Sequence, residues 1–413
     1  MEDSANDTTR SWDAMVSDLE TLTAEMRAKC DGDAPEPPEP PDGDVIYVDG
    51  GDLAAAIKDA PAGAVLDLCA QTFTQAALTV DKPLTLQNGT LLAAPNISDM
   101  LELKGQDITL RDLVLRGNGT TKRGIANQAA NTTLQRVRVE NICREGQESQ
   151  AMAMWSSPGP LLAEDCHFEA GSICFLAGGS TPAIANTIAT GLTFRRCTFT
   201  RPLEFRGAGY AVKSLFELKC AKDVLVEDCD LSNCWKDGQT GFAFVFTPSQ
   251  YGGSPETTVA NVTVRNCRIT NVGGGLNGLG YSQHQNDPDR QTQQGGSYRF
   301  EGNTWQISMA DNGGQGALMQ LGWEPRTVEW IDNDVTADGG AFLRVTDEKP
   351  IEGYSYRGGR VDEPGTYGVF APDGSRGVNW QTIAPSGVIE GVTFINAHST
   401  FKANFPANTY ESA

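Results

Sequence analysis

The chain has 413 residues with 53 acidic and 32 basic side chains, so its net charge is −21 and its pI is near 4.5. This excess of negative charge argues against binding to nucleic acid or to an anionic membrane surface. No run approaches the roughly 18 apolar residues of a membrane span, and the acidic start MEDSANDTTR shows no secretory signal. Ten cysteines without a Cys-x-x-Cys pair, and only three histidines, argue against structural zinc, so we expect no metal or other cofactor.

The first expected element is an amphipathic helix within residues 1–30. Its apolar residues follow the three-four spacing of a heptad seam, and they are Trp12, Met15, Leu19, Leu22 and Met26. The seam spans less than three heptads, and an isolated helix of this length is marginal in water. We therefore expect it to bind sister chains or another protein, with a helix folded onto the rest of the chain as the alternative.

Two short segments connect this helix to the remainder of the chain. Residues 31–44 read DGDAPEPPEPPDGD, which predicts a stiff, extended, acidic linker between separate units. Residues 45–63 are expected to form a helical cap, in which Asp52 begins a short helix over Leu53–Ala60. The apolar face of that helix can cover the open end of the repeats that follow.

One motif recurs from Pro83 to Phe394: two apolar residues two apart, a turn residue, and two more apolar residues two apart. Copies include VLVEDCDL (Val224–Leu231) and VTVRNCRI (Val262–Ile269). Alternation with period two places successive side chains on opposite faces of a strand. A repeat built from such short strands predicts a solenoid, here a parallel β-helix over residues 45–400 with a tail over 401–413.

The turn position of the motif is occupied by Asn, Asp or Gly in nine of eleven copies. These residue types tolerate a left-handed backbone, which bends a strand sharply without ending the sheet. We therefore expect one corner of every coil at this position. The eleven residues are Asn88, Asp112, Arg136, Asp165, Arg196, Asp228, Asn266, Gly302, Asp332, Gly358 and Gly391.

The positions on either side of the corner predict two columns along the solenoid. The position after the corner holds Cys166, Cys197, Cys229 and Cys267 in four consecutive copies. We expect these thiols to stack inside and to stay reduced, because parallel inward side chains rarely reach disulfide torsions. The position before the corner alternates in charge from Glu164 to Glu301, which predicts a ladder of opposite charges that stabilises the register.

The two longest coils, Cys229–Cys267 and Cys267–Asn303, are expected to project loops that form a binding face. Aromatic rings can stack on sugar faces, and acids or Arg can bind sugar hydroxyls. The resulting candidates for carbohydrate contact are Trp235, Asp237, Tyr281, His284, Asp289 and Arg290. Four of them have an ordinary alternative: corner packing for Trp235, a plain loop residue for His284, and turn formation for the aspartates. No catalytic residue can be assigned.

Several aromatic residues follow residue 309. Trp330 and Tyr356 occupy inward positions of the motif and are expected in the core, whereas Trp323 has the setting of an exposed residue. The segment Asp362–Gln381 reads as a loop or hairpin that caps the C-terminal end or contacts a sister chain.

The opening run, DLAAAI followed by APAGAVLDL and KPLTLQNGTL, resembles the start of pectate-lyase-like right-handed parallel β-helix proteins. The segment Lys213–Pro248 is similar to the coil pattern common in that superfamily. The resemblance covers roughly residues 45–400 and implies an all-β, single-stranded, right-handed parallel β-helix. The superfamily contains lyases, glycoside hydrolases, epimerases, phage tailspikes and non-catalytic adhesion proteins, so the fold does not select one activity.

A docking helix, a linker and a long β-helix without a secretion signal together resemble a bacteriophage virion spike. This resemblance implies a homotrimer in the virion that contacts other virion proteins through its N-terminal helix. It also implies binding to a host-surface polysaccharide, with or without its degradation. Two alternatives remain: a non-catalytic capsid decoration or head spike, and a bacterial polysaccharide lyase or glycoside hydrolase.

Overall fold

The computed structural model describes residues 44–412, apart from 181–186, 250–255, 285–286, 315–316, 339, 348, 350, 363, 365–367, 372, 374 and 376–379. The five residues of the predicted heptad seam and nearly all of the predicted linker lie outside the described residues. The described residues belong to one compact unit, Asp44–Ala413.

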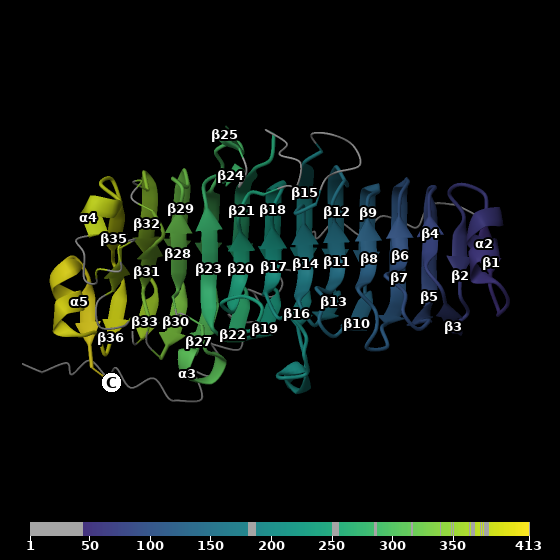
Figure 1. Ribbon diagram of the computed structural model, residues 1–413, viewed down its shortest axis with the longest axis horizontal. Helices are drawn as coiled ribbons and strands as arrows, with labels where there is room; N and C mark the ends of the chain where they lie inside the picture. The colour runs from purple at the N-terminus through teal and green to yellow at the C-terminus, as the bar shows by residue number, and fades with distance from the viewer. Residues whose placement is uncertain are drawn as a thin grey trace, which may run out of the picture. The chain divides into compact units, whose positions relative to one another are not determined.

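Most coils of the unit contribute three short strands, and these strands pair in parallel with their counterparts in the next coil (Figure 1). One coil is formed by β17 (Ser214–Leu218), β18 (Ala221–Glu227) and β19 (Asp230–Cys234). In β18, Val224 pairs with Val262 of the following coil, and Val226 pairs with Val264. The predicted fold class is confirmed: the chain is a right-handed parallel β-helix.

The strands form three ladders. Two of them share a 24-stranded sheet, here sheet A, and the third is an 11-stranded sheet, here sheet B. The first ladder of sheet A comprises β1 (Val45–Tyr47), β2 (Val65–Asp67), β5 (Leu84–Ala93), β7 (Gln106–Arg116), β9 (Ala130–Gln135), β12 (Gly159–Glu164), β15 (Ala189–Arg195), β18, β21 (Val259–Arg265), β26 (Ser297–Glu301), β29 (Thr327–Ile331), β32 (Gly353–Arg357) and β35 (Val388–Glu390). The second comprises β3 (Thr72–Gln75), the C-terminal halves of β5 and β7, β10 (Arg138–Ile142), β13 (His167–Ala170), β16 (Thr198–Thr200), β19, β22 (Arg268–Val272), β27 (Thr304–Ile307), β30 (Asp334–Ala337), β33 (Arg360–Asp362), β36 (Thr393–Ile395) and β37 (Thr409–Glu411).

Sheet B and the remaining elements complete the unit. Sheet B comprises β4 (Leu78–Val80), β6 (Asp99–Leu103), β8 (Arg123–Asn127), β11 (Gln150–Met154), β14 (Ile173–Ala177), β17, β20 (Phe242–Phe246), β23 (Gly274–Leu279), β28 (Met319–Gly322), β31 (Leu343–Val345) and β34 (Val369–Phe370). The other elements are the hairpin β24 (Gln283–His284) and β25 (Asp287–Gln291), and the helices α2 (Leu53–Asp59), η1 (Leu203–Phe205), α3 (Met309–Asn312), α4 (Trp380–Ile383) and α5 (Ser399–Asn404).

The corner between the two ladders of sheet A lies where the motif predicts it. All eleven turn residues have φ between 51° and 68°, in the left-handed region. The two arginines among them carry a Cβ that disfavours this conformation. Each forms a two-bonded ion pair with an aspartate at the corner of the preceding coil: Arg136 with Asp112 at 2.6 and 2.9 Å, and Arg196 with Asp165 at 2.8 and 3.1 Å.

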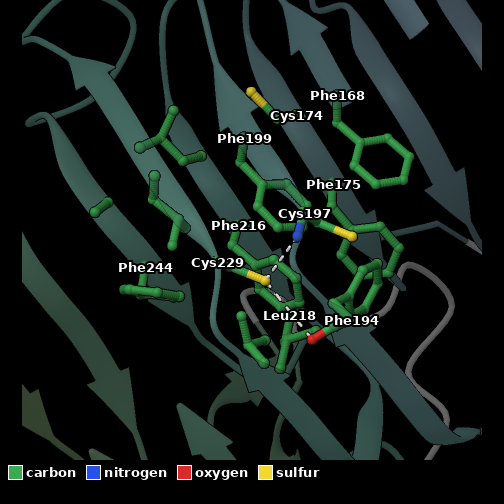
Figure 2. Close-up of a cluster of buried hydrophobic side chains, with 14 of the residues drawn as sticks. Phe168, Cys174, Phe175, Phe194, Cys197, Phe199, Phe216, Leu218, Cys229 and Phe244 are labelled. Atoms are coloured by element: carbon green, nitrogen blue, oxygen red, sulfur yellow. Dashed lines mark hydrogen bonds between the residues drawn. The ribbon is translucent and has the colours of Figure 1, made fainter. Parts of the chain in front are cut away.

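The interior confirms the predicted cysteine column. Cys197 lies between Cys166 and Cys229, and its N–H donates to the Cys229 Sγ at 3.3 Å (Figure 2). All described cysteines are free, and hydrogen bonding to its two neighbours together with burial raises the pKa of Cys197. A cluster of phenylalanine rings fills the space beside this column, with Phe175 and Phe194 at 4.6 Å between centroids. As predicted, Trp330 and Tyr356 are fully buried.

The predicted charge ladder is present from Glu164 to Arg265, whereas the recorded ion-pair partner of Glu301 is Arg299 of the same strand. Glu227 accepts from Arg195 on one side and from Arg265 on the other. Burial raises the pKa of Glu227, but hydrogen bonds from the two guanidinium groups outweigh it, so the net pKa is lowered. Glu164 lies 3.7 Å from Arg195 and extends the ladder by one coil.

The ends of the solenoid differ in how well they were predicted. At the first coil, Asp52 accepts from the Ala55 N–H at 3.1 Å, and Leu53 and Ile57 of α2 are buried, as expected of the cap. At the other end, the predicted boundary at residue 400 is too early. Strand β37 pairs with β36, and Phe401 of α5 packs at 4.8 Å from Phe394, because the last coil also needs a cover for its core.

Much of the predicted loop sequence in the two longest coils forms strands of sheet B. Phe242–Phe246 is β20, in which all five residues are buried, and Gly274–Leu279 is β23. An unbroken apolar run such as FAFVF does not show the alternation by which the other strands were found, because both faces of β20 are covered.

Candidate functional site on the outer face of sheet B

The coil has one tight corner and two variable ones. The corner between the ladders of sheet A is a single left-handed residue in each repeat, whereas both edges of sheet B carry connections of varied length. Residues 280–296, with β24 and β25, project at one edge, and α3 projects at the other (Figure 1). The outer face of sheet B therefore lies between projecting segments on both sides, which is where a solenoid builds a binding surface.

The outward side chains in the middle of this face are buried. The outward residues Leu176 on β14, Glu217 on β17 and Val245 on β20 occupy equivalent positions, and each is at most 5% exposed. The Glu217 carboxylate accepts from Ser214 Oγ at 2.8 Å and lies 3.0 Å from Lys219 Nζ. It is thus buried and fully engaged, and a large ligand cannot reach it.

The face opens from β23 onward. The next three outward residues in the same row are Asn277, Gln320 and Arg344, and all three are partly exposed. Gln320 Nε2 donates to Asn277 Oδ1 at 3.1 Å, so these two amides form a short polar strip across adjacent strands. The strip ends at Arg344, beside Phe370 of β34.

A cluster of side chains borders this strip at the edge that carries β24 and β25. It consists of Tyr281, Trp323, Glu324, Asp347 and Lys349, which we call the Trp323 site. The Lys349 ammonium contacts the Tyr281 hydroxyl and lies 3.3 Å from Glu324 Oε2. It also lies 4.7 Å from the centroid of the Tyr281 ring and 5.3 Å from that of Trp323, within cation–π range.

The backbone of the Trp323 site is strained. Trp323 and Glu324 are consecutive non-glycine residues with φ of 56° and 51°. Such a conformation costs on the order of 1–3 kcal/mol per residue and persists only where the surroundings impose it. The Asp347 carboxylate supplies that constraint, since it accepts from the N–H groups of both Trp323 and Lys349.

Of the six residues predicted for carbohydrate contact, Tyr281 lies in the Trp323 site. Its ring meets Trp323 edge-on at 5.3 Å and is 5% exposed, so it supports the tryptophan and is not itself an open platform. His284, Asp289 and Arg290 belong to the β24–β25 hairpin at the same edge of sheet B. Their side chains lie outside the described part of the structure.

The other two predicted residues lie at the opposite edge of sheet B. Trp235 is 3% exposed and lies beneath the guanidinium of Arg206, 4.8 Å from its ring centroid, so it packs as the ordinary alternative anticipated. Asp237 is exposed in a bend, and its N–H donates to the Gln239 carbonyl at 3.0 Å. The predicted residues thus divide between two edges and do not form one site.

Sequence reasoning missed four of the five residues of the Trp323 site. It looked for function in the longest coils, whereas Trp323, Glu324, Asp347 and Lys349 come from shorter connections in later coils. The only available signal was Trp323, an aromatic residue followed by Glu-Pro directly after a strand.

The chemical groups of the site favour binding over hydrolysis. A glycoside hydrolase needs two carboxylates free to act as acid and base or nucleophile. In the Trp323 site, Glu324 is paired with Lys349, and Asp347 is occupied by two backbone N–H groups. Among the described residues, no group of three or more His, Cys, Asp or Glu is placed to hold a metal ion.

The solved structures that resemble this chain do so distantly. No protein-family model and no curated protein matches the sequence. Among solved structures, an alginate lyase from Paenibacillus sp. str. FPU-7 matches with TM-score 0.42 and 11% identity, over 84% of this chain and 98% of that one. The Dettilon tailspike protein matches with TM-score 0.43 and 11% identity, over 90% and 68%. The pre-mature bacteriophage phi29 gene product 12 matches with TM-score 0.49 and 10% identity, over 92% and 54%.

The parallel pairing of its own strands from coil to coil makes the present chain a parallel β-helix. Among its described residues, no helix is long and apolar enough to cross a membrane.

Proposed function

We propose that this chain recognises a polysaccharide at the Trp323 site and the adjoining strip Asn277–Gln320–Arg344. The observation that carries the proposal is a partly exposed tryptophan held in a strained backbone by a carboxylate, next to a row of amide and guanidinium groups. An apolar ring face and convergent polar groups are what a sugar, with its apolar face and its hydroxyl edge, requires.

The setting of this site supports a role as a virion spike that binds a host-surface glycan. A rod of stacked coils presents a long face to a polymer, and the strong negative charge of the chain suits a particle exposed to solvent. In this proposal the chain is a homotrimer, and its N-terminal helix binds other virion proteins. The tailspike among the solved structures shares the fold alone.

A second candidate activity is lyase cleavage of the bound polysaccharide. The contact between the Lys349 ammonium and the Tyr281 hydroxyl favours it. In such a step the Tyr281 hydroxyl, held by Lys349, would exchange a proton with the sugar, which requires the polymer to uncover the 5%-exposed Tyr281 when it binds. Hydrolysis is less well supported, because both carboxylates of the site are engaged.

Binding can be tested with purified capsule and lipopolysaccharide by titration calorimetry. We expect binding that Trp323→Ala weakens at least tenfold, as expected of a central aromatic anchor. Trp155→Ala serves as the matched control: Trp155 is also partly exposed and follows a strand of sheet B, but its strand lies five strands, about 24 Å, away. Equal binding by the wild type and Trp323→Ala would contradict the proposed site.

Cleavage can be followed in the same mixtures. A lyase releases an unsaturated sugar, seen as new ultraviolet absorbance, and a hydrolase releases reducing ends without it. Lys349→Met should abolish lyase activity. Binding without release of either product would leave a recognition protein, and neither binding nor release would favour a structural decoration of the virion.

A further inference from the structure

Within the described part of the chain, the polar strip on sheet B ends in a cation without a partner. Arg344 lies between Leu343 and Val345, which are buried, so the alternation of β31 places Arg344 on the outer face. It is partly exposed, and among the described residues no hydrogen bond or ion pair reaches its side chain. It contrasts with Arg195, Arg265, Arg299 and Arg360, which all pair with carboxylates on sheet A.

The composition of the chain makes this unpaired arginine informative. Acidic side chains outnumber basic ones by 53 to 32, so acidic partners are plentiful. The position beside Arg344 on β28 is nevertheless the neutral Gln320, and the position on β34 is Phe370. A guanidinium held on a flat face between an amide and an aromatic ring is free to donate two parallel hydrogen bonds to an incoming carboxylate or sulfate.

A second cation faces the same area. The Lys349 ammonium follows β31 by four residues and has Glu324 as its one described acidic partner, at 3.3 Å. The Asp347 carboxylate is occupied by the N–H groups of Trp323 and Lys349 and is not available to neutralise Arg344. Among the described residues at this end of sheet B, Glu324 and Asp347 already have partners, whereas the Arg344 guanidinium is open to an anionic ligand.

We infer that Arg344 is the specificity-determining residue of this face and that the recognised glycan carries an acidic group, either a carboxylate or a sulfate. Arg344 binds this acidic group, and Trp323 contacts the sugar ring. This inference rests on the proposed function and names its substrate class. Asn277 and Gln320 then bind uncharged hydroxyls of neighbouring sugars.

The test compares polymers that differ only in charge. Polygalacturonate is paired with its carboxyl-reduced form, and dextran sulfate is paired with dextran. We expect at least one acidic polymer to bind ten- to a hundredfold tighter than its neutral partner, which corresponds roughly to one charge-assisted hydrogen-bonding contact. Arg344→Gln should remove that preference, and Arg344→Lys should restore part of it.

Arg326→Gln is the control, since Arg326 is exposed and lies one residue before β29, off the outer face of sheet B. It should leave the preference unchanged, which excludes a general effect of net charge. Folding of each variant is checked by its thermal unfolding midpoint, which the loss of an unpaired surface group should not move.

The outcomes separate this inference from the function beneath it. If acidic and neutral members of each pair bind equally, or if Arg344→Gln weakens both alike, the inference is wrong and glycan recognition stands. If neither the four polymers nor the capsule and lipopolysaccharide preparations bind, both are wrong. If Arg344→Gln and Arg326→Gln reduce the preference equally, the effect is one of overall charge and the role of Arg344 is refuted.

Discussion

Replacing Arg201 by Met should destabilise the solenoid strongly, although Arg201 forms no part of the proposed site. Its side chain is completely buried, and all four of its hydrogen bonds go to backbone carbonyl groups. The acceptors are Ala170 at 3.2 Å, Asn233 at 3.1 Å, Ser172 at 2.9 Å and Ser214 at 2.7 Å. Because these acceptors come from three successive coils, one guanidinium group ties the coils together at their edge.

The magnitude depends on the groups that the substitution leaves without a partner. A hydrogen bond to a charged group is worth about 1.5–3 kcal/mol, and four carbonyls lose the guanidinium as a donor, although Ser172 keeps the N–H groups of Lys213 and Ser214. Part of this loss is offset, because burying the guanidinium itself costs several kcal/mol in desolvation. We therefore expect Arg201→Met to lower the free energy of unfolding by roughly 3–5 kcal/mol.

Arg196→Met in the same coil is the matched control. The side chain of Arg196 is 51% exposed and its partner Asp165 is 44% exposed, so this pair should contribute only about 0.2–1 kcal/mol. Urea unfolding can be followed by circular dichroism and by the fluorescence of Trp235, whose ring centroid lies 5.7 Å from the Arg201 guanidinium. If the two variants differ by less than about 1 kcal/mol, the reasoning about Arg201 is refuted.

Three further predictions concern Glu227, Asn333 and Cys174. Glu227→Gln should destabilise the protein at neutral pH but much less at acid pH. The pKa of Glu227 is lower in the folded state, so its carboxylate stabilises the fold above the unfolded pKa of about 4.3, and this stabilisation is lost as the pH falls through the folded-state pKa. Urea titrations at several pH values check this, and a difference independent of pH would contradict it. Asn333→Ala should lower the free energy of unfolding by roughly 2–5 kcal/mol, because the buried Asn333 Oδ1 accepts from the Asn303 backbone N–H, the Asn303 amide and the Trp305 ring N–H. Chemical unfolding measures this loss, and a loss below about 1 kcal/mol would contradict the importance of these three hydrogen bonds. Burial raises the pKa of Cys174 to about 11, so a thiol reagent at pH 8 should leave Cys174 unmodified until urea unfolds the chain. Peptide mapping can check this, and labelling of Cys174 in the native protein would contradict its burial.

The coil itself could be read from the sequence because its determinants are local. A left-handed residue at a fixed position bends the strand wherever it stands, and period two then decides which side chains face inward. For this reason Asp228, Cys229 and Trp330 lie where the motif placed them. The same logic failed for β20, whose sequence FAFVF does not alternate because both of its faces are buried.

The candidate site was decided by tertiary structure. Tyr281, Trp323 and Lys349 come from three different coils, and only the stacking of β23, β28 and β31 brings them to one edge of sheet B. Likewise Trp235 was an equally good aromatic candidate in sequence until Arg206 was found to cover it. Local patterns determine the conformation of each coil, but contact between coils depends on connection length and register, which no single repeat contains.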